Sequence, residues 1–176
     1  IKAYYEYMNN VLDSYDDATF TTQDGKNGYT DTMKNSAVGA DVFFKKRFGE
    51  KLFAKTALRF RYDHNDRQGD VGEEWEHYNQ EILSVPLEFE YKLLKSFTIT
   101  AGSSVDFKFF KRPDNYERET ISAFNPQAAV LFSATDALRF KAAISRKTCF
   151  PTMRELFSGT SGNPDLEPMK TMIYEL

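Results

Sequence analysis

The sequence predicts an all-β fold of antiparallel up-and-down strands that forms part of a transmembrane β-barrel. Three observations lead to this prediction: apolar and polar residues alternate along most of the chain, tight and long connections alternate, and aromatic residues make up 15% of the composition. Neighbouring side chains of a strand point to opposite faces, so alternation gives one apolar and one polar face. Outer-membrane barrels combine such strands with short turns at one end and longer loops at the other.

The alternation places eight strands along the chain. Between positions 83 and 91 the odd residues are Leu, Val, Leu, Phe and Tyr, whereas the even ones are Ser, Pro and two Glu. Similar patterns recur on both sides, and the predicted strands are 1–12, 35–47, 51–63, 81–92, 96–109, 121–134, 138–148 and 170–176. A tilted strand needs about 9–11 residues to span a bilayer, and every predicted strand except the last is long enough.

The predicted connections are of two kinds. Residues 48–50, 93–95 and 135–137 form tight turns, whereas 13–34, 64–80, 110–120 and 149–169 are long and polar. In an up-and-down sheet alternate connections lie at the same end. We therefore expect the short turns on one rim of the sheet and the long loops on the other.

The charged residues decide which face meets lipid. A Lys or Arg that faces the middle of the hydrocarbon layer costs roughly 2–4 kcal/mol. The face opposite the apolar rows carries Lys55, Arg59, Arg61, Glu88, Asp106, Arg139 and Lys141. We therefore expect the apolar rows to face lipid and the charged face to line an aqueous interior.

Two other folds fit the alternation. A soluble antiparallel sheet with one wet face has the same pattern, but a lipocalin-like domain that binds an apolar ligand would point its apolar rows inward. A small closed eight-strand barrel with a structural or adhesive role also occurs in outer membranes. That barrel would require pairing between the first and last strands.

Composition and motifs exclude several functions. The net charge of −3 argues against nucleic-acid binding, and a single cysteine excludes a disulfide framework or a multi-cysteine zinc site. Residues 73–77, Glu-Glu-Trp-Glu-His, differ by one residue from an inverted zinc-protease motif. We expect a solvated acidic loop there rather than a metal site of Glu73, Glu76 and His77, and a polar loop around His64. We expect no catalytic residue, no resident metal and no cofactor, so the protein is not predicted to be an enzyme.

A series of short motifs follows position 124. Phe-Asn-Pro opens a strand at 124–126, Ser-Arg lies at 145–146 near the end of the next, and Phe-Pro-Thr follows at 150–152. Glu-Leu-Phe at 155–157, Gly-Asn-Pro-Asp-Leu-Glu-Pro at 162–168 and Tyr-Glu-Leu at 174–176 complete the series. In this order and spacing the chain resembles the barrel of TonB-dependent outer-membrane receptors, best over 124–176 and more weakly over 35–63 and 96–110.

The resemblance assigns a structural role to a set of motif positions. They are Asn125, Pro126, Arg146, Phe150, Pro151, Glu155, Leu156, Gly162, Asn163, Pro164, Leu166 and Pro168. The sequence departs from the family pattern at Glu167, where Lys is usual, and at Met169, where Glu is usual. Proline fixes φ and removes a hydrogen-bond donor, which suits a rigid connection rather than a central strand.

The resemblance also implies a function. Members of the family import scarce nutrients through a twenty-two-strand barrel in the outer membrane of Gram-negative cells, driven by the TonB complex through an N-terminal plug. Residues 1–176 would be a partial barrel domain, without the plug and the remaining strands, in contact with outer-membrane lipid. A ferric siderophore or other iron complex is the favoured ligand, and a glycan or cobalamin is the alternative within the family.

Rings and cations in the outer loops suit such a ligand, because they stack on and neutralise an anionic iron chelate. The candidate ligand-binding residues are Trp75, His77, Tyr78, Arg112, Tyr116 and Arg118.

Overall fold

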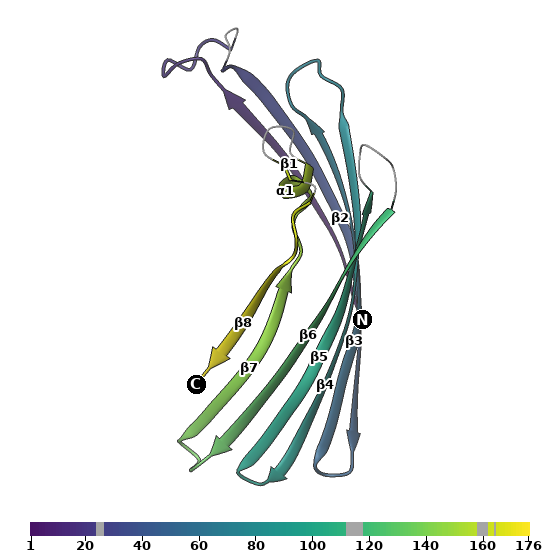
Figure 1. The fold of residues 1–176 in the computed structure, drawn as a ribbon, viewed down its shortest axis with the longest axis vertical. Helices are drawn as coiled ribbons and strands as arrows, with labels where there is room; N and C mark the ends of the chain where they lie inside the picture. The colour runs from purple at the N-terminus through teal and green to yellow at the C-terminus, as the bar shows by residue number, and fades with distance from the viewer. Residues whose placement is uncertain (24–26, 112–117, 158–161, 164) are drawn as a thin grey trace.

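A computed structural model describes residues 1–23, 27–111, 118–157, 162–163 and 165–176, and shows one antiparallel sheet in which each strand pairs with the next (Figure 1). The eight strands are β1 (Lys2–Ser14), β2 (Tyr29–Phe48), β3 (Leu52–Gln68), β4 (Glu76–Leu94), β5 (Phe97–Lys111), β6 (Arg118–Ser133), β7 (Arg139–Cys149) and β8 (Met169–Glu175). A short helix, α1 (Met153–Phe157), lies between β7 and β8. No helix in the described part of the chain is long and apolar enough to cross a membrane.

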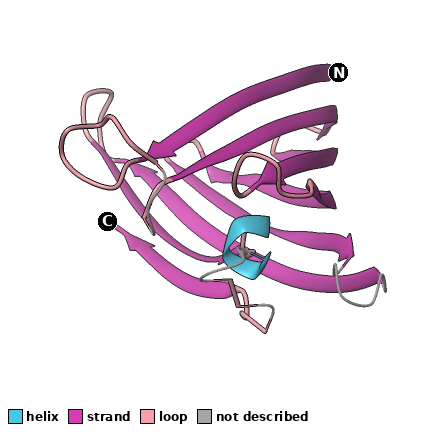
Figure 2. Cartoon of the chain, turned by 90° about the horizontal axis from the view of Figure 1, so that it is seen from above, coloured by secondary structure: helices cyan, strands magenta, loops and turns pink. Residues whose placement is uncertain are grey.

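The sheet is curved and open. Seen from above, the strands follow an arc, and α1 lies on its concave side (Figure 2). Among the described residues β1 pairs only with β2 and β8 only with β7. This arrangement contradicts the closed eight-strand barrel, which needs a ladder between β1 and β8.

The short turns gather on one rim, as predicted. Residues 49–51, 95–96 and 134–138 connect β2 to β3, β4 to β5 and β6 to β7 at the lower end of Figure 1. Gly49 has a φ of 62° in the first of these turns, a conformation that favours glycine because it has no Cβ. The longer connections lie at the opposite end, which we call the outer rim.

The strands extend farther toward the outer rim than predicted. β2 begins at Tyr29 rather than at 35, β3 ends at Gln68 rather than at 63, and β4 begins at Glu76 rather than at 81. The expected loop 64–80 therefore shrinks to 69–75, and the prediction that His64 lies in a loop is wrong because it belongs to β3. The long connection predicted at 149–169 contains the short helix α1, which the sequence analysis did not predict.

A cluster of buried apolar residues lies between α1 and the concave face near the outer rim. Tyr78 and Phe110 pack with Met153 and Leu156, and Leu156 is only 1% exposed. Most other large apolar side chains remain exposed on the sheet. The apolar rows therefore do not form the internal core that a lipocalin-like domain requires.

Candidate functional site

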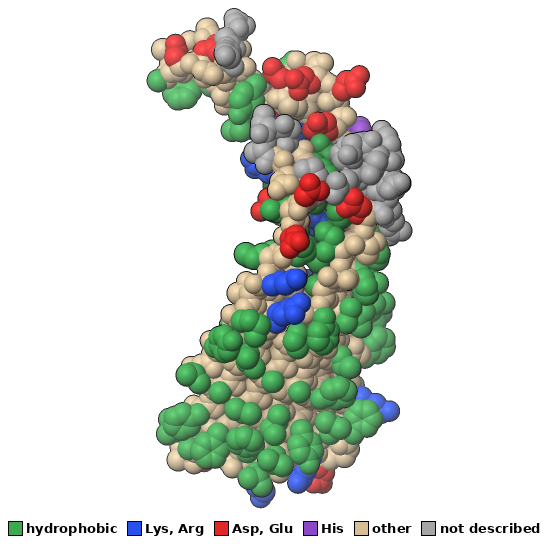
Figure 3. Space-filling view, in the orientation of Figure 1, with side chains coloured by type: hydrophobic (Ala, Val, Ile, Leu, Met, Phe, Trp, Pro, Cys, Tyr) green, Lys and Arg blue, Asp and Glu red, His purple; other side chains and the backbone are tan. Residues whose placement is uncertain are grey.

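The convex face carries an apolar band. Its exposed rows include Leu58 and Phe60 on β3, Val85, Leu87, Phe89 and Tyr91 on β4, Val105 on β5, Phe124, Val130 and Phe132 on β6, and Phe140 on β7. Figure 3 shows hydrophobic side chains over the lower part of the molecule and acidic ones mainly above. The outward row from Leu52 to Tyr62 is about 33 Å long at about 3.3 Å per residue, which is about 25 Å tall at a tilt of about 40°. This height matches the apolar band of outer-membrane barrels.

The concave face is polar and hydrogen-bonded. Lys55 Nζ lies 3.0 Å from Glu88 Oε1 and 3.3 Å from Glu90 Oε2, and Gln127 Nε2 donates to Glu88 Oε2 at 3.1 Å. These contacts join β3 and β4 to β6. They satisfy charges that would be unstable against hydrocarbon, so this face must meet water or protein.

A second network joins β1, β3 and β4 on the same face. Arg61 lies 3.0 Å from Glu6 Oε2 and 2.7 Å from Asp63 Oδ1, and Gln80 Nε2 donates to Asp63 Oδ2 at 2.7 Å. Asp63 is only 8% exposed. Arg61 and Gln80 therefore both bind the buried carboxylate of Asp63.

Asp106 on β5 is the centre of a third network. Its carboxylate accepts hydrogen bonds from Ser84 Oγ, from Ser104 Oγ at 2.8 Å and from Asn125 Nδ2 at 2.7 Å. Asn125 is one of the family-motif positions, and its contact ties β6 to β5. The structural role of Asn125 in the family motif remains a prediction.

The three networks surround a hollow of about 760 Å³ on the concave face. Its lining includes Asp41, Lys55, Arg59, Arg61, Glu88 and Asp106. Charges of both signs line the hollow, so its surface suits a polar, hydrated or charged solute rather than an apolar one.

An ion pair and a capped turn fix the outer rim. Arg67 of β3 donates through Nε and Nη2 to both oxygens of Asp31, at 3.2 and 2.9 Å, and this hydrogen bonding raises the pKa of Arg67. Asp70 accepts the backbone N–H of Thr30 at 3.0 Å and that of Val71 at 2.7 Å, which lowers the pKa of Asp70. Both contacts hold the start of β2 against the end of β3.

The Pro-Thr and Glu-Leu motifs build α1. Thr152 and Glu155 form a capping box: the Thr152 N–H donates to Glu155 Oε2 at 2.7 Å, and the Glu155 N–H donates to Thr152 Oγ1 at 3.2 Å. Pro151 is buried, and its carbonyl accepts a hydrogen bond from Lys108 Nζ of β5. Leu156 then fills the pocket between Tyr78 and Phe110.

The following motif turns the chain back toward β8. The Asn163 N–H donates to the Glu155 carbonyl at 2.8 Å, and the Asp165 N–H donates to Asn163 Oδ1 at 3.0 Å. The Leu166 N–H donates to the Asn163 carbonyl at 3.2 Å. Gly162 and Pro168 flank this turn, and Pro164 lies outside the described residues.

The remaining motif positions lie on or beside β6 and β7. The ladder between these strands begins at Gln127, so Pro126 lies directly beyond its end, where the missing N–H of proline is tolerated. Arg146 is half-buried, and its Nε has no hydrogen-bond partner among the described residues. Phe150 lines the hollow of the concave face.

Of the predicted ligand-binding residues, the three whose side chains the structure describes, Trp75, His77 and Tyr78, do not share one face. Trp75 lies under Lys34 Nζ, 4.5 Å from the ring centroid, and Lys34 belongs to the outward row of β2 that also bears Val38. His77 also points outward, whereas Tyr78 faces inward and is buried against α1. Burial raises the pKa of Tyr78 to about 12. Arg112 and Tyr116 lie outside the described residues, as does the side chain of Arg118 at the start of β6.

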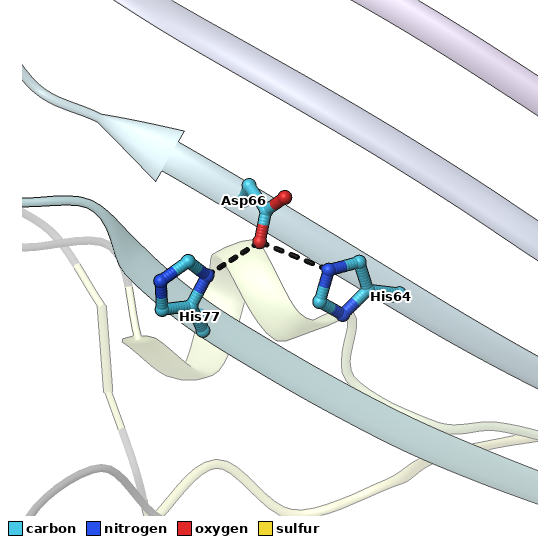
Figure 4. Close-up of side chains that lie close together, drawn as sticks. All are labelled: His64, Asp66 and His77. Carbon is cyan, nitrogen blue, oxygen red and sulfur yellow. Dashed lines mark hydrogen bonds and ion pairs between the residues drawn. The ribbon is translucent and has the colours of Figure 1, made fainter.

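The sequence prediction missed one cluster on the outer rim, formed by His64, Asp66 and His77 (Figure 4). Asp66 Oδ1 lies 2.6 Å from His77 Nδ1 and 3.1 Å from His64 Nε2. The two imidazole rings are nearly parallel, with an interplanar angle of 8° and centroids 6.4 Å apart. Residues 64 and 77 meet because β3 and β4 pair in a register that the sequence alone did not specify.

Three features together define a segment of a transmembrane β-barrel wall. They are the apolar convex band, the polar concave face and the separation of the short turns from the long connections. The sequence matches the family "TonB dependent receptor-like, beta-barrel" over residues 1–176, and the chain belongs to this family. Barrels of this family lie in the outer membrane of Gram-negative cells, which is therefore the location of this chain.

The fold is also similar to a solved structure, "Copper transporter OprC", with a TM-score of 0.78 and 12% sequence identity. The alignment covers 97% of this chain and 32% of that one, so the chain spans about a third of the length of that protein. No curated protein matches the sequence.

Proposed function

We propose that the chain forms part of the barrel wall of a TonB-dependent receptor that binds a nutrient and imports it across the outer membrane. The observation that carries this proposal is the division of the wall into a lipid-facing apolar band and a charged, hollow inner face, in a chain that belongs to the receptor family. Energy would come from the TonB complex through a plug domain outside residues 1–176.

A ferric siderophore or other iron complex is the ligand we favour. Cations and rings lie together in the hollow, where Arg59 lies 5.9 Å from the centroid of the Phe43 ring and Arg61 5.9 Å from that of the Tyr4 ring, and rings with cations suit an anionic chelate. Copper import is the second candidate, because a copper transporter shares the fold. The structural similarity between the two chains supports a common fold, but at 12% sequence identity it does not by itself favour copper.

Uptake by the full-length receptor tests the proposal. A strain that lacks the receptor would receive the full-length protein, with TonB present or absent, and cells would be supplied with radiolabelled ferric siderophores, haem or copper. We expect uptake of an iron complex that requires both the receptor and TonB. TonB-dependent uptake of copper alone would replace iron as the ligand. If every substrate entered at the same rate without the receptor, the import proposal would fail.

A further inference from the structure

We propose that His64, Asp66 and His77 form a binding site for a divalent transition-metal ion on the outside of the barrel wall, beyond the edge of the lipid. This site is separate from the inner face and does not depend on the imported nutrient. Its ligand atoms all lie within 4.8 Å of one another and come from two neighbouring strands.

The position of the cluster follows from the outward rows of β3 and β4. On β3 the row passes from Phe60 and Tyr62 to His64 and then Asp66, so it changes from apolar to polar. The residues opposite on β4 are Asn79 for His64 and His77 for Asp66. The cluster therefore points away from the lumen and lies in water at the outer rim, on rigid strands rather than on a mobile loop.

The donor set suits a late transition metal. Imidazole nitrogens and a carboxylate oxygen are ligands for Zn²⁺ and Cu²⁺, at about 2.0–2.2 Å. Tetrahedral ligands at that distance lie about 3.4 Å from one another, so the 2.6 Å contact between Asp66 Oδ1 and His77 Nδ1 has to open slightly. The proton shared by these two atoms leaves to solvent when the metal binds, and a neutral His77 then carries its proton on Nε2. The His77 side chain is 62% exposed, which leaves it room to rotate.

A hydrogen bond that His64 donates to Asn79 orients the first ligand. Asn79 Oδ1 accepts from Tyr62 Oη at 3.0 Å and lies 2.6 Å from His64 Nδ1. Because this oxygen can only accept, Nδ1 carries the proton, and a neutral His64 presents the lone pair of Nε2. That lone pair faces Asp66 Oδ1, another acceptor, at 3.1 Å. A cation between these two atoms would satisfy both, and metal-binding histidines usually donate their other N–H in this way.

The three ligands leave at least one position for water. Such open sites exchange ligands with the solvent, so the site would take up metal from the medium outside the cell.

By the general order of metal affinities, Cu²⁺ should bind more tightly than Zn²⁺ or Ni²⁺, and Mn²⁺ should bind most weakly of these four ions. Lys34 lies opposite Asp66 on β2, but its Nζ is over the Trp75 ring.

Metal titration of the full-length receptor in detergent tests the site. The chain has two histidines, so the variant His64→Asn/His77→Asn removes every imidazole that it supplies. We expect the wild type to bind one more equivalent of Zn²⁺ by calorimetry than this variant. We also expect a Cu²⁺ electron paramagnetic resonance spectrum with nitrogen hyperfine coupling that the variant loses. Glu74→Gln, in the exposed acidic loop, is the matched control and should bind as the wild type does.

Two further variants make the test independent of folding defects. His77→Asn changes a mostly exposed side chain, so the barrel should fold and keep its heat-dependent gel mobility. This variant should nevertheless lose the additional equivalent of bound Zn²⁺. Asn79→Ala should weaken binding about 10–100-fold, as loss of a supporting hydrogen bond does at other metal sites. Equal Zn²⁺ stoichiometry and affinity in the wild type and in folded His77→Asn would overturn the proposal.

Discussion

Asp31 is one of the few charged side chains that the wall buries, and both of its oxygens accept hydrogen bonds from Arg67. The pair joins the outer ends of β2 and β3, beyond the apolar band. Removal of one partner from a buried pair leaves the other charge unsatisfied, and this costs more than replacing both partners by apolar groups.

We therefore predict that Asp31→Leu destabilises the outer ends of β2 and β3 by about 2–4 kcal/mol, toward the lower part of the range for fully buried pairs because Arg67 is partly exposed. Hydrogen exchange of the full-length protein should show faster exchange at 29–35 and 63–68. The double variant Asp31→Leu/Arg67→Met should recover part of the protection. Unchanged exchange in Asp31→Leu would mean that this pair contributes nothing to the rim.

Neighbouring residues on β6 test which face meets lipid. Ala128 lies in the outward row and Gln127 on the polar face, where it donates to Glu88. We predict that Ala128→Arg destabilises the folded barrel by about 2 kcal/mol more than Gln127→Arg, because a cation on the lipid face loses its hydration. Denaturant titration of the full-length protein in lipid vesicles measures the difference. Equal midpoints would contradict the assignment of the faces.

At the scale of elements, α1 depends on the packing of its side chains, because a helix of five residues has too few hydrogen bonds of its own to be stable. Leu156 is 1% exposed and lies against Tyr78 and Phe110. We predict that Leu156→Ala weakens the docking of α1 by about 2–4 kcal/mol, the usual cost of emptying a buried leucine site. Limited proteolysis should then cut the connection 150–168 faster, whereas the exposed Arg154→Ala should be cut as the wild type is.

The capping box makes the stability of α1 depend on pH. Hydrogen bonds from the Thr152 N–H and hydroxyl lower the pKa of Glu155. A carboxyl with a lowered pKa in the folded state stabilises that state above its ordinary pKa of about 4.3, and the contribution is lost as the pH falls through the lowered value. Hydrogen exchange of α1, corrected for intrinsic rates, should therefore accelerate below about pH 4. Glu155→Gln should remove this pH dependence, and an identical profile in that variant would refute it.

The sequence predicted all eight strands because lipid and water impose alternation on them. It failed at the outer ends of β2, β3 and β4, where outward residues such as Lys34, His64 and His77 already lie in water and need not be apolar. Hydrogen bonds between backbones continue there without a hydrophobic pattern. The helix α1 was missed because five residues are too few to show a helical period.

The candidate sites were less predictable than the strands. The motif positions Asn125, Glu155 and Asn163 make local hydrogen bonds, although the sequence did not specify their partners. Of the described ligand-binding candidates, Trp75 and His77 lie on one face and Tyr78 on the other. An alternating pattern extended from Leu83 back to His77 would have revealed this, but the proximity of His64 to His77 depends on the register in which β3 pairs with β4.

At the scale of the whole molecule, the open sheet has two edge strands, β1 and β8, and each has one side without a ladder to any described residue. Free strand edges pair readily with other chains. We predict that the 176-residue chain, expressed alone and refolded in detergent, forms oligomers by light scattering. In the full-length protein, cysteines in β1 or β8 should cross-link to strands outside residues 1–176. A monodisperse monomer of the short chain would contradict this prediction.

The networks of the concave face have a mechanical consequence. Contacts such as Lys55 to Glu88 and Arg61 to Glu6 join side chains on different strands, and a slip of one residue would turn every such charge toward hydrocarbon. Adjacent strands are thus locked against sliding, so this part of the wall resists shear along its strands.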